Sequence, residues 1–126
     1  MRIVSTFAGI AALAAFGLPS PGLGAPAVHE IAAAGGPATV TWRWDPPTVD
    51  AARGDRVVWR NPTSSAHVVV LYEGPMAGKT LQLPHGGVQR LRLKKPGTYL
   101  YRCGIELHSE LVAGRCVGQC GEITVE

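Results

Sequence analysis

Apolar and polar residues alternate in short stretches along most of the chain, which is the pattern of strands with one buried face. The apolar positions that share a face are Val40, Trp42 and Trp44; Val57 and Trp59; and Leu91 and Leu93. Turn sequences such as Asp45-Pro46-Pro47 and Pro96-Gly97 separate these stretches at short intervals. The pattern predicts an all-β chain of about seven or eight short strands, folded as a Greek-key β-sandwich.

The same alternation orders the stretch from Gly97 to Cys103. Tyr99, Tyr101 and Cys103 fall on one face of this predicted strand, so an inward-facing pair of tyrosines implies an inward-facing thiol. An immunoglobulin-like sandwich has a similar penultimate strand, but it normally carries a second cysteine well upstream. No cysteine precedes Cys103 in the sequence, and this alternative is therefore disfavoured.

The N-terminal segment differs from the rest of the chain. Met1-Arg2 is followed by an apolar run over residues 3–18, and Ala25-Pro26-Ala27 supplies a small-residue cleavage pattern. The run is shorter than the roughly 20 residues of a membrane-spanning helix, which favours a cleaved signal over a membrane anchor. We expect residues 1–27 to be a secretory signal peptide, with the exact cleavage site open. Residues 28–126 then form one exported domain, periplasmic, extracellular or at the cell surface.

The charge of the chain argues against a nucleic-acid partner. The 126 residues carry a formal net charge of +3, and because Arg2 is the only charged residue in 1–27, removal of that segment leaves +2. The remaining basic residues are scattered among apolar ones, as on solvated strand faces, and form no basic stripe.

The three cysteines cannot all pair with one another. In an exported protein, one disulfide leaves one thiol over. Cys116 and Cys120 are close enough in sequence to pair across a tight loop, which would leave Cys103 free. Cys103 and His108 would then present a thiolate and an imidazole from one short loop, a combination that suits a soft metal ion. His67, ahead of a valine-rich run, can supply the next ligand.

Four parts of the sequence, in this order, resemble the cupredoxins, the small blue-copper family that includes plastocyanin and azurin. They are residues 54–61, His67, residues 97–108 and residues 121–125. The resemblance implies one type 1 copper ion held by two imidazole nitrogens and one thiolate, with a weak axial fourth ligand. His67, Cys103 and His108 match the three strong positions, whereas His29 and His85 match none.

The axial position departs from the usual family pattern. A methionine normally stands two residues before the glycine that opens the last strand, whereas here Gln119 stands before Gly121. This resembles the stellacyanin branch, in which a glutamine amide oxygen replaces the thioether and, being harder, favours Cu(II). Because the loop from His108 to Gln119 is longer than usual, Glu106 or Glu110 could take the position instead, or no axial ligand could be present.

The resemblance implies an electron carrier and not an enzyme. Such a protein passes single electrons between redox proteins that dock transiently near His108, where Leu107 and Leu111 are candidates for an apolar docking surface. We expect a monomer that acts on no small-molecule substrate. Two alternatives stay open. The same ligands would serve a copper buffer or delivery protein, and one cysteine with two histidines also serves catalytic metal sites, for which Glu106 and Glu110 are candidate bases.

Overall fold

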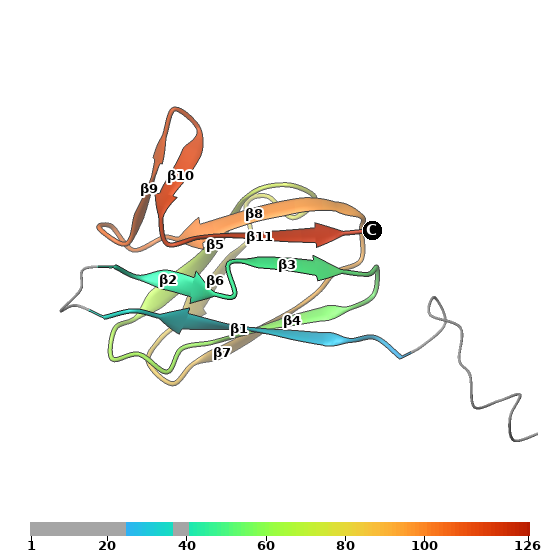
Figure 1. Ribbon diagram of the computed structural model, residues 1–126, viewed down its shortest axis with the longest axis horizontal. Coiled ribbons are helices and arrows are strands. Elements are labelled where there is room, and N and C mark those ends of the chain that lie inside the picture. Colours follow the sequence, from blue (N-terminus) through green and yellow to red (C-terminus); the bar gives the residue numbers. More distant parts are fainter. Residues whose placement is uncertain (1–24, 37–40) are drawn as a thin grey trace, which may run out of the picture.

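A computed structural model of the chain describes residues 25–36 and 41–126 (Figure 1). The described residues form the strands β1 (Val28–Ala34), β2 (Arg43–Asp45), β3 (Thr48–Ala51), β4 (Arg56–Arg60), β5 (His67–Glu73), β6 (Thr80–Leu83), β7 (Val88–Arg92), β8 (Gly97–Cys103), β9 (Ser109–Val112), β10 (Arg115–Gly118) and β11 (Cys120–Val125). No helix in these ranges is long and apolar enough to cross a membrane. Residues 1–24 of the predicted signal peptide (residues 1–27) lie outside the described residues, and so does Val40. The signal peptide remains a prediction.

The strands build two sheets, packed as layers, and a separate hairpin (Figure 1). One sheet has the order β2-β1-β4-β7 and the other has the order β3-β11-β8-β5-β6, while β9 and β10 form the hairpin. β1 runs parallel to β4, and β3 runs parallel to β11. Figure 1 shows the β9–β10 hairpin projecting away from the sheets. The predicted all-β sandwich is confirmed.

The described residues contain more strands than the alternation predicts. β2 and β3 are separate because the chain crosses from one sheet to the other at Pro46 and Pro47, which cannot donate hydrogen bonds to a strand ladder. β9 and β10 occupy the long loop ahead of Gln119. Their apolar side chains Val112 and Val117 are exposed, so this hairpin lacks the one-sided burial pattern by which a strand is recognised.

The core lies between the two sheets, and alternation buries one face of each central strand. The buried residues of β8 are Tyr99, Tyr101 and Cys103, as the sequence predicts. Trp44 and Trp59, from the opposite sheet, pack against Tyr101 with 5.7 and 5.3 Å between ring centroids. Tyr101 also lies across Gly121, where a Cβ atom would overlap the tyrosine ring. A glycine is therefore required at this position of β11.

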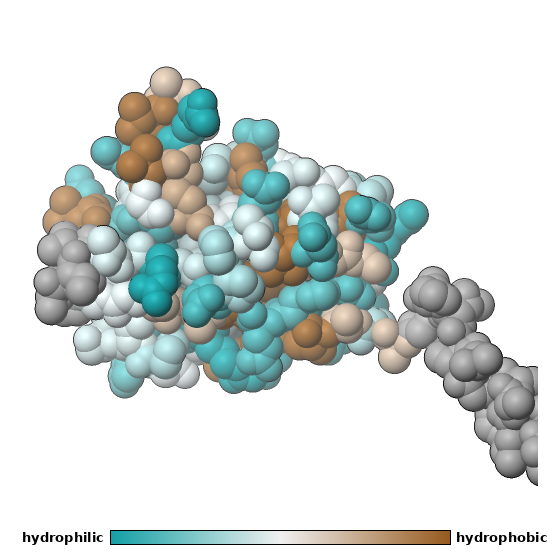
Figure 2. Space-filling model, in the orientation of Figure 1, coloured by the Kyte–Doolittle hydropathy of each residue, from teal (hydrophilic) through white to brown (hydrophobic). Residues whose placement is uncertain are grey.

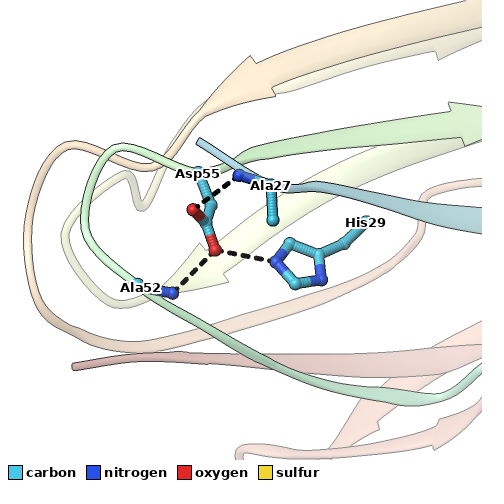
Figure 3. A network of polar contacts seen from close by, with 4 residues as sticks. All are labelled: Ala27, His29, Ala52 and Asp55. Atoms are coloured by element: carbon cyan, nitrogen blue, oxygen red, sulfur yellow. Dashed lines mark hydrogen bonds and ion pairs between the residues drawn. The ribbon is translucent and has the colours of Figure 1, made fainter. Parts of the chain in front are cut away.

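A carboxylate ties the start of β1 to the turn before β4 (Figure 3). Asp55 is buried, and its Oδ2 accepts hydrogen bonds from Nε2–H of His29 and from the N–H of Ala52, both at 2.9 Å. Its Oδ1 accepts from the N–H of Ala27 at 3.0 Å. The bond from His29, together with the two amide bonds, holds the pKa of Asp55 below its usual value against the opposing effect of burial. His29 therefore has a structural role.

Strand order brings distant parts of the sequence to one end of the five-stranded sheet. β8 is antiparallel to both β5 and β11, so its last residue, Cys103, lies near the first residues of its two neighbours. The register pairs Cys103 with Val69 of β5. His67, the first residue of β5, and Gln119, just before β11, consequently reach the same region as Cys103.

Candidate metal centre

Two imidazoles and one thiol converge at this end of the sheet. One ligand atom from each of His67, Cys103 and His108 lies within 4.8 Å of the others. The Sγ atom of Cys103 is 3.7 Å from Nδ1 of His67 and 3.5 Å from Nδ1 of His108. His67 and Cys103 are buried, whereas His108 is half-buried. The group therefore faces the interior, with one imidazole close to the surface.

The hydrogen bonds around His67 determine which ring nitrogen carries its proton. The side-chain NH₂ of Asn61 donates to two main-chain carbonyls at 2.7 and 2.9 Å, so Oδ1 of Asn61 is an acceptor. This Oδ1 lies 2.6 Å from the Thr63 hydroxyl, and the Ser65 carbonyl lies 3.1 Å from it. Two oxygens only 2.6 Å apart need a proton between them, so the single hydroxyl proton of Thr63 goes to Asn61. Oγ1 of Thr63 then accepts from Nε2–H of His67, 2.9 Å away. Nδ1 of His67 is left as a bare lone pair facing Cys103.

Gln119 is buried beside this group and turns its amide oxygen toward it. Its Nε2 donates to the main-chain carbonyl of Arg43 at 3.2 Å, which leaves Oε1 pointing to the site, 3.1 Å from Nδ1 of His67. Its N–H donates to the carbonyl of His108 at 2.9 Å, and its carbonyl accepts from the N–H of Cys103 at 3.0 Å. The main chain of Gln119 is thus bonded to two of the three residues of the candidate ligand group.

Burial sets the protonation of the group. Burial, together with the nearby charge of His108, lowers the pKa of His67 to about 4, and burial also lowers the pKa of His108. Both imidazoles are therefore neutral donors at neutral pH. Burial raises the pKa of the Cys103 thiol, so the thiol keeps its proton until a cation stabilises the thiolate.

The donor atoms fit the copper ion that the sequence implies. Nδ1 of His67 and Oε1 of Gln119 are both acceptors at 3.1 Å, with no proton between them at neutral pH. A cation would satisfy both lone pairs at once. Two imidazole nitrogens, one thiolate and a weak oxygen donor are a ligand set that suits copper.

Two tryptophans form a wall of the site that the sequence analysis does not identify. Trp42 lies edge-on to His67 and is stacked on His108, with 5.0 and 4.9 Å between ring centroids. Trp44 lies 6.0 Å from His67. The alternation places both indoles on one strand face, but it does not indicate that this face covers the candidate metal ligands.

The two carboxylates that compete for the axial position lie outside the group. Glu106 and Glu110 are exposed and line a surface pocket of about 730 Å³ beside His108. Neither belongs to the converging metal-ligating group. Because Gln119 is buried with its amide oxygen at the site, the geometry favours Gln119 over either carboxylate.

Cys116 and Cys120 form a disulfide with 6.0 Å between their Cα atoms, and Cys103 is a free, buried cysteine. This is the division of the three cysteines that the sequence favours. The bridge spans Gln119 and ties the β9–β10 hairpin to the five-stranded sheet.

No protein-family model and no curated protein sequence matches the chain. Solved structures do match it. A purple cupredoxin from Nitrosopumilus maritimus aligns at 20% identity and a TM-score of 0.59, over 78% of this chain and 99% of that one. Two amicyanin variants align at 20% identity, each over 79% of this chain and 82% of the other. One is an oxidized methionine-to-lysine variant with a TM-score of 0.57, and the other is a methionine-to-glutamine variant in the Cu(I) form with a TM-score of 0.56. These likenesses, with the sheet order described above, identify the fold of this chain as the cupredoxin fold.

Proposed function

We propose that this chain is an exported, single-domain copper protein that carries single electrons between redox proteins. His67, Cys103 and His108 are its strong ligands, and Gln119 is its weak axial ligand. The observation that carries the proposal is the convergence of two Nδ1 atoms and one Sγ atom. The bond to Thr63 keeps the proton of His67 on Nε2, which leaves Nδ1 unprotonated. The fold likeness to amicyanin in its Cu(I) form supports copper as the metal.

The main chain leaves the ligands little freedom to move. His67 begins β5, Cys103 ends β8, and Gln119 is hydrogen-bonded through its main chain to both Cys103 and His108. Bound copper would supply a one-electron couple between Cu(I) and Cu(II). Ligands held on strand ends need not rearrange when the electron moves. This rigidity supports an electron carrier over a delivery protein, whose ligands must open to release the ion.

His108, the half-buried ligand, is the proposed route for the electron to the surface. Large apolar side chains are exposed beside it and along the hairpin: Leu107 (94%), Leu111 (42%), Val112 (50%) and Val117 (53%). Figure 2 shows hydrophobic side chains gathered on the projecting β9–β10 hairpin. An exposed apolar surface of this kind suits brief docking of a redox protein through a small interface.

Export, the monomeric state and the lack of a small-molecule substrate belong to the same proposal. Residues 1–27 supply the signal, and the Cys116–Cys120 disulfide agrees with an oxidising compartment. Glu106 and Glu110, the candidate bases for catalysis, lie outside the metal-ligating group, so no contact in the described residues favours an enzyme.

Copper loading of the purified domain tests the proposal. We expect an intense visible thiolate-to-copper band and reversible one-electron voltammetry. Cys103→Ser should abolish the band while circular dichroism still reports a folded sandwich, and the double variant Cys116→Ser, Cys120→Ser is the control that should keep the band. A copper-loaded protein without the band contradicts the proposed site. Tight copper binding with irreversible voltammetry would favour a buffer or delivery protein instead.

A further inference from the structure

His108 is the least restrained of the three metal-ligating residues. It lies on the loop between β8 and β9, directly after Leu107, whose main chain has a left-handed φ of 78°. Nε2 of His67 is held by Thr63, whereas Nε2 of His108 has no hydrogen-bond partner among the residues that the structure describes. Its side chain also borders the surface pocket. The ring interacts with Sγ of Cys103, 3.5 Å from its Nδ1, and with the side chain of Gln119, so further restraint must come from contacts between rings.

The indole of Trp42 provides that contact. It is stacked on the imidazole of His108 with 4.9 Å between centroids and 27° between ring planes. The same indole lies edge-on to His67, with 5.0 Å between centroids and 72° between planes. Stacked and edge-to-face arrangements are the two favourable geometries of aromatic pairs. One ring that is not a ligand thus contacts both imidazoles of the site.

The segment that carries Trp42 is itself fixed. The next residue, Arg43, pairs with Ala34 of β1 and accepts a hydrogen bond from the side chain of Gln119 at 3.2 Å. Trp44 is almost fully buried in the core. Trp42 also lines the surface pocket, so its ring covers the imidazoles on the pocket side. A ring on so well anchored a segment can restrain a loop residue.

We propose that Trp42 is a positioning residue of the metal centre, whose stacked indole holds His108 in its ligand orientation. The inference rests on the proposed function only for the identity of the metal. An aromatic pair of this geometry favours the held orientation over a rotated one by up to about tenfold. This preference exists before a metal arrives, so the indole preorganises Nδ1 of His108 toward Cys103.

Three substitutions separate stacking from bulk and from folding. Trp42→Phe keeps a ring face, Trp42→Leu keeps apolar volume without a ring, and Trp42→Ala removes both. Chelator competition with Co(II) and with Cu(I) should show about tenfold weaker binding for the Leu and Ala variants, and less than about threefold for Phe. In the metal-free protein, side-chain NMR signals of His108 should broaden or split in the Leu and Ala variants only. Val28→Ala, at an exposed apolar residue in the same sheet as β2 but away from the pocket, is the control that should change neither readout.

The proposal is wrong if Trp42→Leu has a lower melting temperature but keeps wild-type metal affinity and wild-type His108 signals. Trp42 would then be an ordinary packing residue. If Trp42→Ala fails to fold, the comparison of Phe with Leu is sufficient. A wild-type protein that binds Co(II) but shows no visible copper band would overturn the proposed electron carrier. In that case the NMR signals of the metal-free variants would still test Trp42.

Discussion

At the scale of single residues, the site depends on where protons lie as much as on which side chains are present. The amide of Asn61 is fixed by two carbonyls, the hydroxyl of Thr63 is committed to Asn61, and the Nε2–H of His67 is committed to Thr63. The order of these donors leaves the lone pair of Nδ1 available to a metal. Substitutions that keep shape but change the donor order can therefore test the site without disturbing the sandwich.

Thr63→Val should weaken metal binding by about 10- to 100-fold, the usual effect of removing a group that orients a ligand histidine. Valine has nearly the shape of threonine but cannot accept the Nε2–H of His67, so the required tautomer loses its support. Thr63→Ser, which keeps the hydroxyl, is the matched control. Competition with a chelator measures both affinities. Equal affinity of the Val variant and the wild type would remove Thr63 from the site.

Gln119→Met should raise the reduction potential, because a thioether is softer than an amide oxygen and stabilises Cu(I) relative to Cu(II). For a one-electron couple, a tenfold change in the equilibrium constant corresponds to about 59 mV, and axial identity is a known determinant of this potential. Methionine also cannot donate to the Arg43 carbonyl, so we expect a stability loss of about 1 kcal/mol. Voltammetry and urea unfolding measure the two effects.

Glu110→Gln and Glu106→Gln are the controls for the axial assignment, since each removes a charge near the site without touching Gln119. They should shift the potential only slightly. If one of them alters both potential and spectrum while Gln119→Met alters neither, a carboxylate is the axial ligand.

At the scale of elements, a strand is predictable when its alternation coincides with one-sided burial, as in β8, where Tyr101 and Cys103 face the core. The candidate ligand group of His67, Cys103 and His108 was predictable because residue types and their order carry the copper pattern. The stacking of Trp42 on His108 and the bond from Gln119 to the Arg43 carbonyl were not. Both depend on how one sheet lies against the other, which no local pattern records.

The hairpin offers a test of whether the disulfide or the main chain holds Gln119 in place. The bridge joins residues four apart in sequence, and closing so short a loop accounts for about 2 kcal/mol of stability. We expect the double variant Cys116→Ser, Cys120→Ser to lose about that much in urea unfolding. It should keep the wild-type potential, because the bonds of Gln119 to His108 and Cys103 remain. A large change in potential would show that the bridge positions the axial ligand.

At the scale of the whole molecule, the metal-ligating group and the Asp55 network lie at opposite ends of the strands. Cys103 is the last residue of β8, whereas Asp55 precedes β4 and holds the segment before β1 (Figures 1 and 3). Changes at the Asp55 end should therefore alter stability and leave the spectrum of the metal centre unchanged.

Asp55→Asn should cost about 2 kcal/mol of unfolding free energy at neutral pH, because an amide cannot accept both main-chain N–H groups and the bond from His29. The folded-state pKa of Asp55 is lowered. Its contribution is therefore fully present above the unfolded pKa of about 3.9 and is lost as pH falls through the lower folded value. Urea unfolding between neutral and acid pH should show a shallower acid loss in the variant. Asp50→Asn, on an exposed residue, is the control, and equal acid profiles for all three proteins would contradict the role of Asp55.

In the proposed function, Leu107 belongs to the apolar surface on which a redox partner docks. Its side chain is 94% exposed and its main chain has a φ of 78°, so it combines two features that do not favour folding. Leu107→Gly relieves the left-handed strain, and unfolding free energy should stay the same or rise by up to about 1 kcal/mol after the entropic cost of glycine.

Electron transfer from the Leu107→Gly variant to a protein oxidant such as a soluble cytochrome c should slow by about tenfold, because docking loses apolar contact area. Stopped-flow rates with ferricyanide, which needs no apolar docking, should stay at the wild-type value. If both oxidants slow equally, Leu107 acts on the metal centre itself, and if neither slows, the docking surface lies elsewhere.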